Sequence, residues 1–145
     1  MDDEKIFGML DQCIEKAVFA LENGQRLEPF AMTLEADDTT QYIAFDEADH
    51  EKHYELLLEA LRAEAKNGGV KAVALIARVT IPENFNPTVP EGIRIHVEER
   101  ASSHEKIAAR LLYIPYQLFR KEGDEKVNVH LHHPIPVGLP SEIFV

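Results

Sequence analysis

Apolar residues change their spacing along this chain, and that change limits the possible folds more than any other feature. In residues 3–22 and 46–66 they recur every three or four positions, which is the spacing of an amphipathic helix. Each stretch is followed by an Asn-Gly pair, which is typical of the end of a helix. From residue 70 onward the apolar residues mostly alternate, which is typical of β-strands. The sequence therefore predicts two helices in the first half and a sheet in the second.

Six stretches have the pattern that a strand requires. Residues 29–34 and 41–45 are separated by turn-forming residues and predict a β-hairpin between the helices. Residues 70–81 are apolar at odd and even positions, which indicates a central strand covered on both faces. Three more strands are predicted at residues 93–98, 107–120 and 126–132, and Pro115 implies a bulge, an edge or a break in the second of them.

These elements predict an α+β fold in the order α-β-β-α-β-β-β-β. We expect an antiparallel sheet of about five to six strands, with two acidic amphipathic helices on one face. The length of 145 residues is that of one ordinary domain, so residues 1–145 are expected to form a single α+β domain. Residues 134–145 are rich in proline yet apolar, and we expect them to be a tail without regular structure that is docked on the body.

The negative charge is confined to the first half of the chain. Residues 1–66 hold 17 of the 26 acidic residues and 6 of the 15 basic ones, whereas residues 67–145 hold 9 of each, so the net charge of −11 lies on the first half. Nucleic acid is not expected as a partner, because affinity for phosphates depends on Lys and Arg contacts. A protein partner with a basic surface fits this charge, although solvated acidic helices that keep the chain soluble are the simpler explanation.

The sequence also limits the compartment. Cys13 is the only cysteine, so no disulfide can form within the chain. The first residues are acidic rather than basic, and no apolar run approaches the ~18 residues of a membrane span. We expect a soluble cytoplasmic protein that does not enter a membrane.

No common catalytic motif occurs in the chain. It has no GxSxG, GxxxxGK[ST], GxGxxG, HExxH or CxxC sequence. This absence removes the usual phosphate-binding, dinucleotide-binding and serine-hydrolase interpretations. It leaves open whether the protein is an enzyme of another kind.

The histidines suggest one candidate site. His130 and His132 are two residues apart on a predicted strand and so point to the same face. If the strand that carries His96 lies nearby, its predicted exposed face adds Arg94, His96 and Glu98. Three histidines with an open fourth position can bind zinc, Glu98 could act as base on a bound water, and Arg94 could hold an anionic substrate. The alternative is that these residues are the polar, exposed face of an antiparallel sheet.

Two further features could contact a ligand or partner. Residues 82–92 contain three prolines and Phe85, which predicts either a ligand-binding loop with Phe85 as a lid or a stiff connection in which Phe85 caps the core. Phe19 and Leu56 project from the polar sides of the two predicted helices and could belong to a contact surface.

For function, the leading hypothesis is an acidic binding or protein-interaction module without catalytic activity. A homodimer formed through an edge strand or through the exposed sheet face is compatible with it. The alternative is a metal-dependent enzyme or metal sensor built on His96, His130 and His132. No cofactor is expected under the first hypothesis, and a divalent transition metal is expected under the second.

Overall fold

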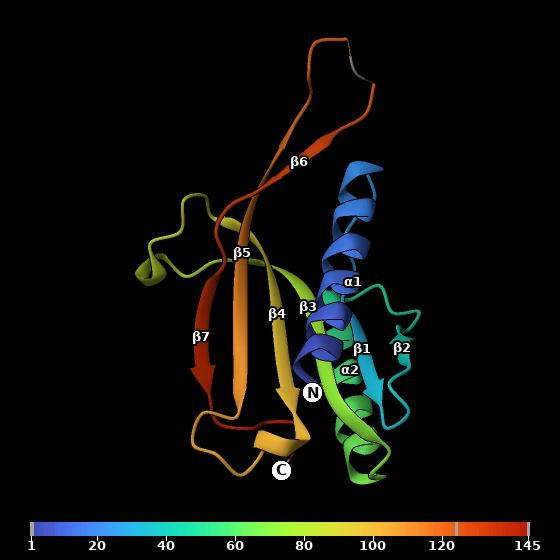
Figure 1. Ribbon diagram of the computed structural model, residues 1–145. Helices are drawn as coiled ribbons and strands as arrows, with labels where there is room; N and C mark the ends of the chain where they lie inside the picture. Colours follow the sequence, from blue (N-terminus) through green and yellow to red (C-terminus); the bar gives the residue numbers. More distant parts are fainter. Residues whose placement is uncertain (1, 124, 145) are drawn as a thin grey trace.

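The computed structural model describes residues 2–123 and 125–144. In these residues the chain forms two helices and a seven-stranded antiparallel sheet (Figure 1). The elements are α1 (Asp2–Glu22), β1 (Phe30–Glu35), β2 (Thr40–Ile43), α2 (His50–Lys66), β3 (Val70–Thr80), β4 (Glu91–Glu99), β5 (Ala109–Phe119), β6 (Asn128–Leu131) and β7 (Ile135–Leu139). The predicted α+β class and element order are confirmed, with β7 as one additional strand.

The sheet has the spatial order β2-β1-β3-β4-β5-β6, and β7 also pairs with β5. Its centre consists of β3, β4 and β5, the long strands that lie side by side in Figure 1. The chain adds these strands in sequence, so each new strand forms a hairpin with the one before it. Helix α2 connects β2 to β3, and β3 pairs with β1 on the side opposite to β2.

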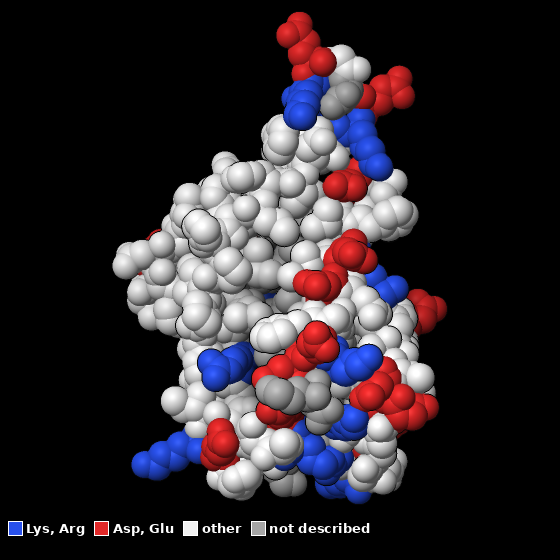
Figure 2. All heavy atoms as spheres, viewed as in Figure 1, with Lys and Arg blue, Asp and Glu red and all other residues white. Residues whose placement is uncertain are grey.

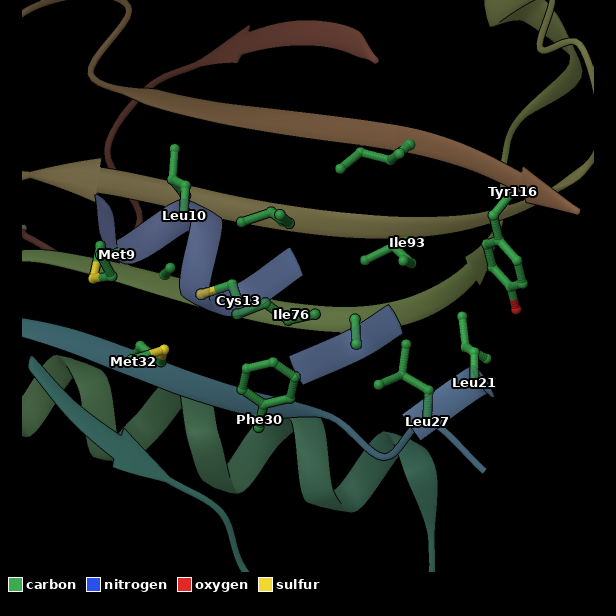
Figure 3. Packing of buried hydrophobic residues seen from close by; sticks show 14 of the residues in the cluster. Met9, Leu10, Cys13, Leu21, Leu27, Phe30, Met32, Ile76, Ile93 and Tyr116 are labelled. Carbon is green, nitrogen blue, oxygen red and sulfur yellow. The ribbon is translucent and has the colours of Figure 1, made fainter. Parts of the chain in front are cut away.

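The helices pack on opposite faces of this sheet, which corrects the prediction that both lie on one face. Met32 of β1 and Ile76 of β3 pack in one core cluster with α1 (Figure 3). Ala31 and Leu75, from the same two strands, pack in a second cluster with Leu57 and Leu61 of α2. The reason is that β3 is apolar at odd and even positions, so both of its faces must be covered.

Strands β6 and β7 form one edge of the sheet, joined by an irregularity. Tyr116 of β5 pairs with Leu131 of β6, and Tyr113 of β5 pairs with Ile135 of β7. Between these two pairs, residues 132–134 therefore lie opposite only residues 114–115 of β5. Because of this extra residue, Leu131 faces α1 whereas Ile135 faces the opposite side. Pro115 stands at the same place, and its carbonyl accepts a hydrogen bond from the amide of His132 at 2.8 Å. The predicted irregularity near Pro115 therefore lies in the facing strand, while β5 continues through the proline.

The prediction that residues 134–145 lack regular structure needs correction, because five of them form β7. The carbonyl of Leu139 accepts a hydrogen bond from the amide of Ala108, which shows that the odd-numbered residues of β7 direct their backbone groups toward β5. Pro136 has the opposite orientation, so the strand does not lose a ladder hydrogen bond at this proline. Residues 140–144 then pass to the α2 side of the sheet. Val145, the last residue of the predicted tail, lies outside the described residues.

Candidate functional site

Arg94, His96 and Glu98 stand in a row on β4, on the side that α2 covers. The side chains of His96 and Glu98 are each only 2% exposed, so the prediction of a solvent-exposed face is wrong for these two residues. The structural reason is that residues 141–144 lie across this end of β4 and donate hydrogen bonds to Glu98. The alternating polar pattern of β4 therefore marks a buried polar cluster and not a hydrated surface.

The carboxylate of Glu98 accepts hydrogen bonds from five donor groups. Ser141 Oγ and His96 Nε2 lie 2.6 Å from its oxygens. The amides of Glu142, Ile143 and Phe144 point at the same carboxylate from 3.0, 3.1 and 3.3 Å. Burial opposes ionisation, but the hydrogen bonds outweigh it and lower the pKa of Glu98 to about 2. Glu98 is thus a buried anion that holds the C-terminal segment in place.

The C-terminal segment also closes the core on the α2 side. Ile143 and Phe144 are buried in the same cluster as Leu57 and Leu61 of α2. Arg100 lies over the Phe144 ring, with 4.8 Å from the guanidinium carbon to the ring centroid. These contacts leave Glu98 without a face toward solvent, so in this arrangement its carboxylate has no access to a water or substrate.

Arg94 and Phe85, the other predicted ligand contacts, lie near each other on this side of the sheet. The guanidinium of Arg94 stacks on the ring of Tyr54 of α2 at 5.1 Å. The next strand carries Tyr113 opposite Arg94, and the Phe85 ring is 5.4 Å from the Tyr113 ring. Phe85 is half-buried against the sheet, as expected for a residue that caps the core. The Nε of Arg94 is buried and has no hydrogen-bond partner among the described residues.

His130 and His132 lie at another part of the sheet, and the structure does not bring His96 to them. Their rings contact each other edge to face with centroids 4.6 Å apart, and His132 Nε2 is 2.8 Å from Gln117 Oε1. On β5, His96 pairs with Leu111 and His130 pairs with Gln117, six residues further along, or roughly 20 Å. The predicted proximity of the three histidines is therefore corrected, because β5 separates β4 from β6. Within residues 2–123 and 125–144, no three His, Cys, Asp or Glu side chains are arranged so that they could hold a metal ion.

A groove that the sequence did not predict as a site lies between α1 and the edge strand β2. It has a volume of about 550 Å3, and Phe19, Leu27, Phe30 and Tyr42 supply its apolar lining. Phe19 is 62% exposed and Tyr42 is 55% exposed. The Tyr42 ring lies 5.4 Å from the buried ring of Phe30, and Lys16 Nζ stands 4.9 Å above the Tyr42 ring. Phe19 was the visible sequence signal, because it projects from the polar side of its helix.

A second uncovered surface lies on the α1 side of the sheet, beyond the helix itself. We call it the open face. It consists of two groups, Val97 of β4 with Leu112 of β5, and Leu118 of β5 with Val129 and Leu131 of β6. Between the groups lie Ile114 and Tyr116, which are buried in the cluster with α1. Leu118 is largely exposed, and the other four are half-buried. Figure 2 shows this side of the molecule, where the surface over β4, β5 and β7 is largely uncharged while charged residues gather at the hairpin tip and the lower end.

Comparison with known protein families, with curated proteins and with solved structures finds no match to this chain. In the part of the chain that the structure describes, neither helix is long and apolar enough to cross a membrane.

Proposed function

We propose that this protein is a cytoplasmic protein-interaction module without catalytic activity, which forms a homodimer through the open face and recruits a partner with a basic surface through its acidic half. The observation that supports this proposal most directly is the open face. One helix covers each side of the sheet, and α1 contacts β1, β3 and β6 and packs in one cluster with the buried Ile114 and Tyr116 of β5. At the margins of α1 on this side, partly exposed Leu and Val side chains of β4, β5 and β6 stay in contact with water.

Burying such side chains in a second protein is favourable by about 25 cal/mol for each Å2 of apolar area removed from water. The hairpin of β5 and β6 extends the open face beyond the body of the molecule, as Figure 1 shows. An isolated two-stranded hairpin is only marginally stable in water, so a partner packed against it would stabilise it.

Charge favours a second copy at this face. Each copy carries a net charge of −11, all of it from residues 1–66, so two copies repel each other where their acidic halves meet. The open face comes from the charge-balanced part of the chain, and it allows two copies to approach with the acidic halves apart. A twofold dimer uses the same surface twice, which an apolar face readily permits.

The edge strand β7 is a poor alternative interface. Pro136 is one of its outward-facing residues, and proline has no amide hydrogen to donate to an added strand. Pairing through β7 is therefore disfavoured as the dimer interface.

Replacing Leu112 by arginine is expected to convert the dimer to a monomer, because a charge would then be buried in the interface. The measurement is the molar mass by light scattering during gel filtration, at several concentrations. The matched control is Leu111→Arg, since Leu111 is also half-buried but faces the α2 side of the same strand. A wild-type chain that is monomeric at high concentration, or a dimer that Leu112→Arg leaves intact, would contradict the proposal.

The metal hypothesis now depends on His130 and His132 alone. Zinc sites in proteins use at least three protein ligands, and this pair supplies two. We therefore expect tag-free protein to contain far less than one equivalent of metal by mass spectrometry, and a chelator to leave its melting temperature unchanged. A metal at near-unit stoichiometry that disappears in the His130→Ala/His132→Ala variant would favour the metal enzyme or sensor instead.

A further inference from the structure

We propose that the groove between α1 and β2 binds an extended, basic segment of a partner protein. The segment adds to β2 as a further strand and places an aromatic or long aliphatic side chain between Phe19 and Tyr42. This inference rests on the proposed function, because it names the surface that the basic partner would use.

The first support is the free backbone edge of β2. The carbonyl of Thr39 accepts a hydrogen bond from the amide of Glu35 at 2.8 Å, so Thr39 and, by alternation, Gln41 and Ile43 direct their backbone groups toward β1. Thr40 and Tyr42 then direct their amides and carbonyls away from the sheet. No backbone hydrogen bond to these groups is found within the described chain. No proline blocks this edge, so it can accept an added strand.

The second support is that the apolar groove lies beside this edge. Tyr42 faces the α1 side of the sheet, since its partner Met32 packs in the α1 core. A hydrogen bond of 3.3 Å from Thr40 Oγ1 to Gln12 Oε1 ties β2 to α1. A strand added to β2 would alternate its side chains, and those on the α1 side would enter the groove. Its volume of about 550 Å3 is within the usual range of ligand sites.

The third support is charge. The groove belongs to the acidic half of the chain, and its own lining holds two acidic residues, Glu15 and Glu28, and two basic ones, Lys16 and Arg26. The two bases at its rim are engaged, Lys16 with the Tyr42 ring and Arg26 with Glu28 at 3.6 Å. Glu28 Oε2 has no hydrogen-bond partner among the described residues, and the Glu28 side chain is 44% exposed and so within reach of a partner. A donor from the partner, such as a lysine, an arginine or a backbone amide, would satisfy this acceptor.

The same features count against other occupants. A nucleic acid would bring phosphates to an acidic surface, which costs free energy and releases no counterions from Lys or Arg contacts. A second copy that paired its own β2 with this edge would bring a second acidic half to the same place. A basic peptide in extended conformation satisfies the free strand edge, the aromatic lining and the charge together.

The test is a selection of short random peptides, displayed on phage, against the immobilised full-length protein. We expect enriched peptides to combine Lys or Arg with an aromatic residue, and to bind more weakly as salt rises. Phe19→Ser should weaken binding of the selected synthetic peptides by about tenfold or more, because an aromatic contact is lost. NMR hydrogen exchange should show that the amides of Thr40 and Tyr42 become protected when the peptide binds.

Phe7→Ser is the matched control, because Phe7 is a phenylalanine of the same helix with a similar exposure, 64% against 62% for Phe19. It should leave peptide binding unchanged. Selection that enriches no basic peptide, or equal binding by the Phe19→Ser variant, would overturn the proposal. Light scattering on the Phe19→Ser variant tests the dimer separately from the peptide groove. The variant should lose peptide binding but remain a dimer.

Discussion

Replacing Glu98 by glutamine is expected to reduce the free energy of unfolding by about 3 to 5 kcal/mol, the range for removing one partner from a buried ionic network. Glutamine has nearly the same shape, but one acceptor oxygen becomes an NH2 group. That group would face donors from Ser141, from His96 or from the amides of residues 142–144, all of which now point at the carboxylate. Buried donors that face one another lose their hydrogen bonds to the carboxylate and gain no hydrogen bonds to water in return.

Urea denaturation followed by circular dichroism measures this loss. Glu91→Gln is the control, because Glu91 lies on the same strand as Glu98 but is exposed. A substitution at such a surface position is expected to change the free energy of unfolding by less than about 0.5 kcal/mol. If Glu98→Gln costs no more than this control, then Glu98 does not hold the C-terminal segment in the way the hydrogen bonds indicate.

Acidification is expected to remove about 3 kcal/mol from the free energy of unfolding through Glu98 alone. Its pKa is lowered from 4.5 to about 2 in the folded protein, chiefly by the hydrogen bonds that outweigh burial. A carboxylate with a lowered folded-state pKa contributes its full stabilisation above pH 4.5, and the contribution is lost as the pH falls from 4.5 to about 2. Hydrogen bonds from Thr39 and Lys71 also lower the pKa values of Asp37 and Asp38, so part of the acid response comes from these exposed groups.

The contribution of Glu98 can be isolated by comparing two pH profiles. Unfolding free energies of the wild type and of Glu98→Gln, measured from pH 7 to pH 2, share the contributions of Asp37 and Asp38. Their difference should be constant above about pH 5 and should shrink below pH 4.5. Parallel profiles over the whole range would show that Glu98 titrates normally in the folded protein.

The secondary structure could be predicted closely because it depends on local spacing. The first helix was expected at residues 3–22 and spans Asp2–Glu22, and the central strand was expected at 70–81 and spans Val70–Thr80. The second helix begins at His50 rather than near residue 46, because the side chain of Asp49 accepts a hydrogen bond from the amide of Lys52 and caps it. Strand β7 was missed because its prolines suggested irregular chain, whereas alternate prolines are tolerated on the outer side of an edge strand.

The candidate site was harder to predict because its contacts are distant in sequence. The donors to Glu98 on residues 141–144 are 43 to 46 residues away, so no local pattern reveals that the carboxylate is buried. Alternation of polar and apolar residues shows that β4 has two different faces, but not which one meets water. His53 illustrates the same limit, because it is buried on α2 and its Nε2 accepts the amide of Phe45 at 3.0 Å.

The proline in β7 also affects how the molecule can assemble. Growth of a filament by strand addition requires two open sheet edges, one on each side, so that every added copy offers a new edge. Here β2 offers such an edge, whereas Pro136 removes an outward amide donor from β7 at the opposite margin. Growth that joins β2 of one copy to β7 of the next is therefore disfavoured, while β2 stays free for a partner of another kind.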